Sequence, residues 1–158
     1  MKIFNADDII QFAIRVEEDG ETLYRKVAET VKDKDVRELF LFLAGQEVTH
    51  KAVFQQMLSG IETLPPAETY DGEYVSYLND YIDGKVIFTD KVKGEAISTG
   101  KDTLSAITFA LKREADSILY YQEAKRFIAQ KYHNAVDKII DEERKHFVKL
   151  SELRKKYT

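Results

Sequence analysis

The chain has 158 residues, 44% hydrophobic and 33% charged, a composition typical of one globular domain, which we expect to span 1–158. It contains no cysteine, which excludes disulfide bonds, Cys-ligated zinc and Cys-ligated iron clusters within it. Its net charge of -4 comes without a basic stretch and no run approaches the ~18 apolar residues of a membrane span, so we expect a cytoplasmic protein with no nucleic-acid and no membrane partner.

The first part of the chain predicts two helices joined by a short turn. Asn5 is placed to cap a helix over 5–32, because two aspartates follow it in the first turn and face the positive end of the helix dipole. A second helix is expected to begin near Asp35, where Asp35-x-x-Glu38 resembles a capping box, and to end at Gly60. Because few residues separate the two helices, we expect an antiparallel hairpin.

The last part of the chain predicts another hairpin, over about 102–157. Its helices are expected over 102–129 and 134–157, again with a short connection. Between this hairpin and the first, which covers about 5–60, lies the segment 61–101, which opens with two prolines. A helix of about 26 residues is roughly 39 Å long, and about 12 extended residues would cross that distance. We therefore expect this segment to be a crossover that runs the length of the bundle.

Each expected helix carries a stripe of apolar residues, spaced alternately three and four apart, with a carboxylate in its middle. This spacing places the stripe on the face that packs into a bundle. Two of the helices add a histidine one turn after the carboxylate, so that both side chains lie on one face. The four carboxylates and two histidines are Glu17, Glu47, His50, Glu114, Glu143 and His146.

Four carboxylates that meet in one core need a counter-charge. Burying one of them without compensation costs several kcal/mol, and no stripe contains a lysine or arginine that would balance it. Two divalent metal ions would balance four carboxylates, with the two imidazoles as neutral ligands. The stripes therefore predict a site for two metal ions, and the alternative is a salt-bridged core without metal.

The two hairpins are copies of each other. Glu17 and Tyr24 recur 97 residues later as Glu114 and Tyr121, and Glu47 with its histidine recurs 96 residues later. A duplicated hairpin gives an approximate two-fold axis, which places one metal ion on each half. Tyr24 and Tyr121 are expected to donate hydrogen bonds to ligand carboxylates.

This ligand set resembles the di-iron site of the ferritin-like superfamily, closest to its rubrerythrin and bacterioferritin branch. The resemblance rests on Glu17, Glu47-x-x-His50, Glu114 and Glu143-x-x-His146. It implies an all-α fold, a ferritin-like four-helix bundle of two antiparallel hairpins joined by one long crossover. It also implies two iron ions, for which manganese and zinc are alternative occupants. By resemblance, Glu47 and Glu143 bridge the irons, Glu17 and Glu114 are terminal ligands, and each histidine binds one iron.

Two departures from the rubrerythrin pattern shape the expected function. Rubrerythrins usually carry a Cys₄ rubredoxin domain, which this chain lacks, so we expect electrons to come from a separate protein such as a rubredoxin. Rubrerythrins also usually place a further glutamate one turn after the terminal ligand of the third helix, where this chain has Ser117. Ser117 and Gly20 are small, and we expect them to leave room for a small molecule beside the metals.

The resemblance implies an oxidoreductase, a rubrerythrin-like peroxidase or a ferroxidase, that reduces hydrogen peroxide or dioxygen and assembles as a homodimer. One alternative is a ferritin-like protein that oxidises and stores iron. Another is a structural bundle in which metal serves only folding. Shell-sized assemblies would favour storage, and a redox-inert zinc occupant would favour the structural role.

Overall fold

The structure, a computed structural model, describes residues 5–60, 76–77, 80 and 102–158. The expected crossover over 61–101 lies outside the described residues apart from the few just named. No helix in the described ranges is long and apolar enough to cross a membrane. The four long helices that form the bundle are α1 (Ala6–Thr30), α2 (Lys34–Ser59), α5 (Thr103–Ala124) and α6 (His133–Arg154).

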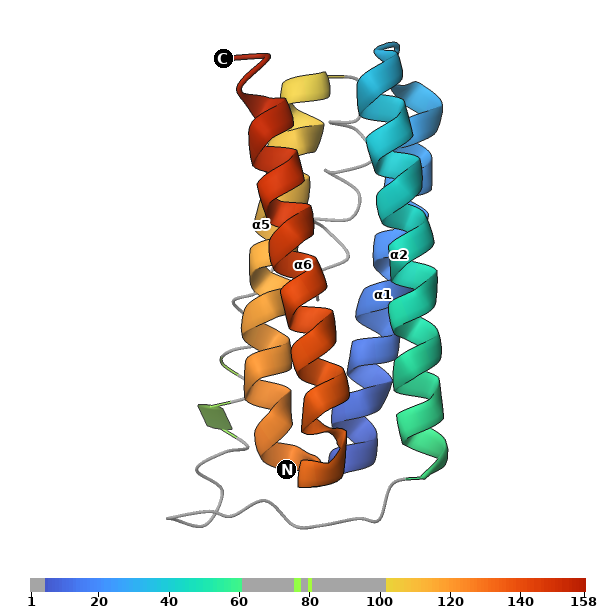
Figure 1. Ribbon diagram of the computed structural model, residues 1–158, viewed down its shortest axis with the longest axis vertical. Coiled ribbons are helices and arrows are strands. Elements are labelled where there is room, and N and C mark those ends of the chain that lie inside the picture. Colours follow the sequence, from blue (N-terminus) through green and yellow to red (C-terminus); the bar gives the residue numbers. More distant parts are fainter. Residues whose placement is uncertain (1–4, 61–75, 78–79, 81–101) are drawn as a thin grey trace.

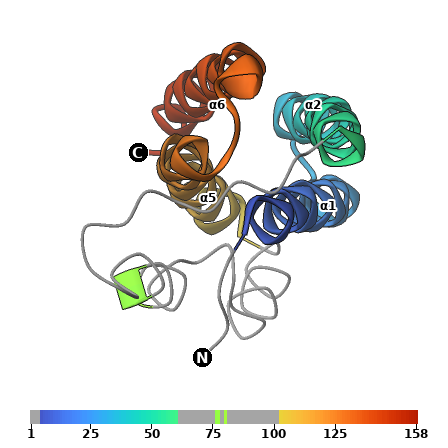
Figure 2. The same cartoon turned by 90° about the horizontal axis from the view of Figure 1, so that it is seen from below.

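The helices form a four-helix bundle made of two antiparallel hairpins, which confirms the predicted all-α fold. α1 packs against α2, and α5 packs against α6 (Figure 1). Seen along the bundle, α1 lies beside α5 and α2 lies beside α6, with the four helices at the corners of a square (Figure 2). α2 ends at one end of the bundle and α5 begins at the other, which is the order that one crossover between two hairpins requires.

The starts of the first two helices are fixed by capping side chains. Asn5 caps α1 as predicted, in a reciprocal capping box. The Asn5 side chain accepts a hydrogen bond from the Asp8 amide, and the Asp8 side chain accepts one from the Asn5 amide. The cap predicted for α2 is wrong by two residues. Asp33, not Asp35, is the N-cap, because its carboxylate accepts a 3.2 Å hydrogen bond from the Val36 amide, and α2 begins at Lys34.

The connection between α5 and α6 is longer than predicted. α5 ends at Ala124 rather than near residue 129, and two short 3₁₀ turns, Lys125–Phe127 and Gln130–Tyr132, follow it. The Tyr132 hydroxyl donates a 2.7 Å hydrogen bond to the carbonyl of Gly60, which ties this connection to the end of α2. α6 starts at His133, and its last residue is Arg154 instead of the expected 157.

The core consists of two apolar clusters with a polar layer between them. One cluster contains Tyr24, Phe40, Ile107 and Leu150. The other contains Ile10, Phe54, Tyr121 and Ile139. The middle turns of all four helices carry the buried charged residues. This order along the helices is the one that the stripes predict, and it places the charged layer where apolar packing excludes water on both sides.

Candidate metal centre

The six residues of the predicted site lie together in one buried layer. Each of these residues is at most 2% exposed. Every long helix contributes to the layer, so the site exists only when both hairpins are in place. The contributors are Glu17 from α1, Glu47 and His50 from α2, Glu114 from α5, and Glu143 and His146 from α6.

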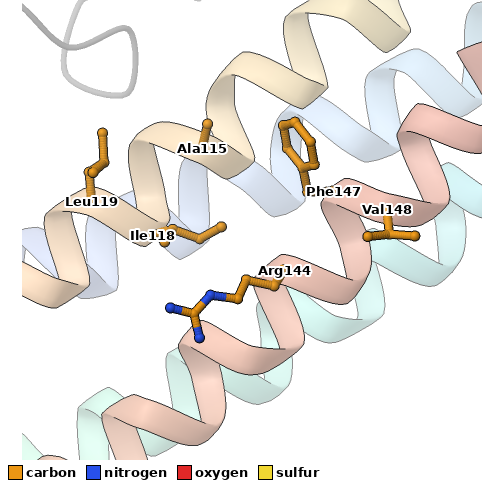
Figure 3. A pocket seen from close by; sticks show the side chains of 6 residues that line it. All are labelled: Ala115, Ile118, Leu119, Arg144, Phe147 and Val148. Carbon is orange, nitrogen blue, oxygen red and sulfur yellow. The ribbon is translucent and has the colours of Figure 1, made fainter.

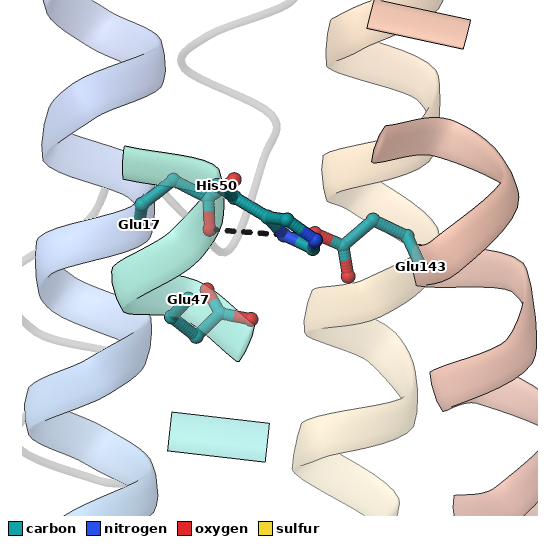
Figure 4. A group of neighbouring side chains, drawn as sticks. All are labelled: Glu17, Glu47, His50 and Glu143. Carbon is teal, nitrogen blue, oxygen red and sulfur yellow. Dashed lines mark hydrogen bonds and ion pairs between the residues drawn. The ribbon is translucent and has the colours of Figure 1, made fainter. Parts of the chain in front are cut away.

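The six residues form two overlapping groups, each able to offer four ligand atoms to one metal ion. Within each group the ligand atoms lie within 4.8 Å of one another. Glu47 and Glu143 belong to both groups, which is the arrangement that ligands between two ions require. Figure 4 shows one group converging from α1, α2 and α6. Glu17 and His50 complete the first group, and Glu114 and His146 complete the second.

Both histidines turn their Nδ1 atoms toward the carboxylates. His50 Nδ1 lies 3.0 Å from Glu143 Oε1 and 3.6 Å from Glu17 Oε2. His146 Nδ1 lies 3.1 Å from Glu143 Oε2 and 3.7 Å from Glu114 Oε2. The two rings are stacked, with centroids 5.8 Å apart. Nδ1 is therefore the nitrogen that each histidine presents to the layer. The contacts with Glu17 and Glu114 follow the two-fold relation between the hairpins, whereas both histidines contact Glu143 and neither of these contacts has an equivalent at Glu47.

Carboxylates raise the affinity of both imidazoles for a proton. Burial alone would lower the pKa of His50, but the neighbouring carboxylates of Glu143 and Glu17 raise it to about 11. Burial opposes the shift at His146 as well, where Glu114 and Glu143 raise the pKa to about 9. Protons on these imidazoles and metal ions are therefore alternative partners for the same carboxylates.

The pKa values of the carboxylates themselves are shifted in different directions. Burial, together with the charge of Glu143, raises the pKa of Glu114 to about 8. Burial likewise raises the pKa of Glu47 well above its usual range, against the opposing charge of Arg113. Burial would raise the pKa of Glu143 too, but the neighbouring Glu114 carboxyl and hydrogen bonds from both histidines hold it well below its usual range.

Two tyrosines hold the terminal carboxylates from the opposite hairpin. The Tyr24 hydroxyl on α1 donates to Glu114 on α5, and the Tyr121 hydroxyl on α5 donates to Glu17 on α1. Burial raises the pKa of both phenols well above the usual value, so both remain protonated donors. Each hydrogen bond links one hairpin to the other and leaves the second oxygen of its carboxylate facing the layer.

Sequence reasoning missed Glu142 as a partner of the site. It lies off the α6 stripe and its side chain is 43% exposed, yet its carboxylate lies 2.7 Å from His50 Nε2. A ligating imidazole commonly donates its second N–H to a carboxylate, which fixes the orientation of the ring. The spacing of four residues relates Glu142 to His146 on its own helix, so no signal in the sequence pointed to the contact with His50 on α2.

Sequence reasoning also missed Arg113, a basic residue outside every stripe whose side chain nevertheless reaches the layer. Its side chain is 4% exposed, and Nη2 lies 3.2 Å from Glu47 Oε2. Nη2 also donates to the Val16 carbonyl, and Nη1 lies 3.4 Å from the Tyr24 hydroxyl, within hydrogen-bond distance. No stripe contains Arg113, but a long side chain that starts beside a stripe can still enter the core.

The expectation that Gly20 leaves room for a small molecule is wrong as well. A Cβ atom at this position would lie 2.2 Å from Arg113 Nη2 and 2.3 Å from Glu47 Oε2. The space beside Gly20 is therefore filled by the guanidinium and the carboxylate. Ser117 lies in the layer with its side-chain oxygen buried.

Buried oxygens that need a partner are concentrated here. In the described ranges, the buried oxygens without a hydrogen-bond partner include Glu17 Oε2, Glu47 Oε1, Glu114 Oε2 and Ser117 Oγ, and Glu47 Oε2 has only its ion pair with Arg113. An unsatisfied buried acceptor costs free energy, and a cation bound between these oxygens removes that cost. Oxygen and imidazole donors without thiolate suit iron, manganese or zinc. The residues present therefore fit a pair of divalent metal ions.

A separate groove on the outside of the second hairpin takes no part in this layer. It has a volume of about 470 Å³, and Figure 3 shows its walls on α5 and α6. Its lining residues are Ala115, Ile118, Leu119, Arg144, Phe147 and Val148. None of the groove's lining residues is an acidic or histidine ligand, so the groove offers nothing to a metal ion.

Comparisons with known proteins agree with this geometry. The family model described as Rubrerythrin matches residues 8–154. A crystal structure described as that of a ferritin-like diiron-carboxylate protein from Thermotoga maritima is similar to the chain with a TM-score of 0.75 and 28% identity, over 100% of this chain and 99% of that one. No curated protein matches the chain. The chain therefore belongs to the rubrerythrin family, within the ferritin-like diiron proteins.

Proposed function

We propose that the protein is a di-iron oxidoreductase that reduces hydrogen peroxide or dioxygen with electrons from a separate protein. The observation that carries the proposal is the pair of ligand groups that share Glu47 and Glu143 in a layer closed to water. Membership of the rubrerythrin family supports iron as the occupant, with manganese and zinc as alternatives.

In this proposal the two halves of the site divide the ligands equally. Glu17 and His50 would hold one ion, Glu114 and His146 would hold the other, and the two shared glutamates belong to both ligand groups. When bound, the iron pair would supply two electrons for the reduction of the oxidant. The protein keeps the oxidant away from competing reactions because apolar clusters close the layer on both sides.

Residues around the ligands keep the site in position. Tyr24 and Tyr121 hold Glu114 and Glu17 by hydrogen bonds from protonated phenols, which leaves one oxygen of each carboxylate for metal. Glu142 accepts a hydrogen bond from the N–H at His50 Nε2 and so fixes the tautomer that presents Nδ1 to the layer.

The electron donor and the assembly belong to the same proposal. The chain contains no cysteine and so holds no Cys-ligated iron centre of its own. A small electron-transfer protein such as a rubredoxin is therefore the proposed reductant. The proposed assembly is a homodimer, which light scattering would test.

One observation favours a second candidate, iron oxidation and storage. Ser117 stands where the rubrerythrin pattern usually has a further glutamate, and its buried oxygen has no hydrogen-bond partner in the part of the chain that the structure describes. The layer therefore has six ligands, which is the number in the bacterioferritin-like pattern, and lacks the seventh of the rubrerythrin pattern.

Metal analysis followed by rapid mixing separates the candidates. Protein purified from its own organism is expected to contain two irons per chain. After reduction, it should react faster with hydrogen peroxide than with dioxygen, and it should turn over only with an added electron donor. Faster reaction with dioxygen, together with shell-sized assemblies, would favour storage. Zinc in place of iron would favour a structural role.

A further inference from the structure

Arg113 places a positive charge inside the carboxylate layer, and the proposed function gives it no task. Its guanidinium is buried and extends from α5 to α1, where it donates to the Val16 carbonyl. Nη2 lies 3.2 Å from Glu47 Oε2. Glu47 is one of the two carboxylates that both ligand groups share. The guanidinium therefore faces the carboxylate on which both metal positions depend.

The neighbouring helix is built to accept this side chain. A Cβ atom at Gly20 would lie 2.2 Å from Nη2 and 2.5 Å from Cζ of Arg113, so any larger residue at this position would displace the guanidinium. The arginine also breaks the repeat, because the residue 97 positions earlier is Val16. The repeated hairpin alone therefore does not account for a cation at this place.

The guanidinium has opposite effects on the layer without metal and on the layer with metal. Without metal, four carboxyl groups share the layer with two imidazoles that gain protons, and Arg113 adds a permanent positive charge beside Glu47. With metal, the same guanidinium repels each divalent ion in surroundings where charges are poorly screened. Removing it should therefore weaken the layer without metal and strengthen the binding of metal.

We propose that Arg113 is an internal counter-ion of Glu47 that holds the carboxylate layer together before metal binds and lowers the affinity of the layer for divalent cations. The proposal rests on the proposed function, because it assumes that the layer binds metal. It makes Arg113 a positioning residue for the carboxylates rather than a ligand. A purely structural arginine would act differently, since its loss would weaken the fold and metal binding together.

The test uses Arg113→Met, which keeps an unbranched side chain and removes the charge. Mn²⁺ is titrated into chelator-treated protein by calorimetry, and both forms are unfolded in urea. We expect the Mn²⁺ dissociation constant of the variant to fall by at least about tenfold. We also expect the variant to lose more stability without metal than with it. Arg25→Met removes an exposed arginine paired with Glu21 on α1 and serves as the control, with an unchanged dissociation constant.

The urea comparison decides the matter even where the metal-free variant does not fold. A variant that is unfolded without metal but resists urea with Mn²⁺ has lost more stability without metal than with it, as the proposal expects. Equal losses in the two forms, or weaker Mn²⁺ binding, would overturn the counter-ion role and leave a structural arginine. Arg113→Lys keeps the charge and should bind Mn²⁺ within about threefold of the unmodified protein. If the unmodified protein binds no Mn²⁺, the proposed function fails first, and the two failures are thereby distinguished.

Discussion

Glu17 and Glu18 are neighbours on α1 in entirely different surroundings. Glu17 is fully buried among the ligands, whereas Glu18 is exposed and lies outside both ligand groups. We expect Glu17→Ala to lower the metal content from two ions to one, because it removes a ligand of the first group alone. Glu18→Ala should keep both ions, because the glutamate that it removes lies outside the layer. Elemental analysis of the two variants after dialysis checks this.

The same pair tests the ligand assignment against its neighbours in sequence. Two tightly held ions in Glu17→Ala would show that this carboxylate is not a ligand. Loss of metal from Glu18→Ala would show that the face of α1 has been assigned wrongly. Circular dichroism of both variants shows whether the helices persist, so that unfolding is not mistaken for the loss of a ligand.

The buried titratable groups predict that the metal-free protein loses stability as pH rises. The raised pKa of Glu114, about 8, means that its contribution is complete below its unfolded value of about 4.5 and is lost as pH rises through 8. His50 and His146, raised to about 11 and about 9, contribute fully below about 6.5 and lose that contribution at higher pH. The lowered pKa of Glu143 acts in the opposite sense, but only in acid.

Thermal unfolding of chelator-treated protein from about pH 5 to about pH 10 measures this loss. The melting temperature is expected to fall steadily across the range. The metal-loaded protein should change less, because metal takes the place of the protons that the layer would otherwise hold. A metal-free melting temperature that stays level or rises over the same range would contradict protonated groups in the layer.

At the scale of the elements, the start of α2 depends on one carboxylate. Asp33 accepts from the Val36 amide and from the Tyr157 hydroxyl, so it also joins α2 to the chain after α6. Asp33→Ala should lower the melting temperature clearly, whereas Asp35→Ala removes only an exposed partner of Lys156 and should leave it nearly unchanged. Equal effects of the two substitutions would show that Asp33 is not the cap.

The hydrogen bond from the Tyr157 hydroxyl is the main reason why the pKa of Asp33 is lowered. A lowered carboxyl pKa contributes stability above its unfolded value of about 3.8, and the contribution disappears as pH falls through the folded value. The difference between the two aspartate variants should therefore vanish in strong acid. Melting curves at low pH provide this second check on the cap.

Periodicity predicted the helices and their inward faces well, because a stripe depends on where each Cα–Cβ bond points. It predicted the ends less well, since the 3₁₀ turns after Ala124 keep nearly helical backbone angles and disturb the pattern little. It also failed at Arg113, whose long side chain enters the core from beside the stripe. Arg113 follows Ala110 by three residues and precedes Ser117 by four, so an alternative path along the same face includes it.

At the scale of the whole molecule, the charged layer couples the two hairpins. Each terminal carboxylate is held by a tyrosine of the other hairpin, and each ligand group draws on both hairpins. The sequence predicted this coupling through the repeat, because two copies of one hairpin bring equivalent residues to the same height. It could not predict the departures from symmetry, which depend on contacts between single side chains across helices.

Those departures make the two halves of the centre chemically unlike. Glu142 reaches Nε2 of His50, but the residue 96 positions earlier, which would face His146, is the uncharged Gln46. A carboxylate behind one imidazole makes that ring the stronger electron donor. Two irons bound here would therefore occupy different ligand fields, and ⁵⁷Fe Mössbauer spectra of the reduced protein should show two quadrupole doublets of equal area. An evenly shared valence would be disfavoured, so that a one-electron reduced centre would keep its extra electron on one chosen iron.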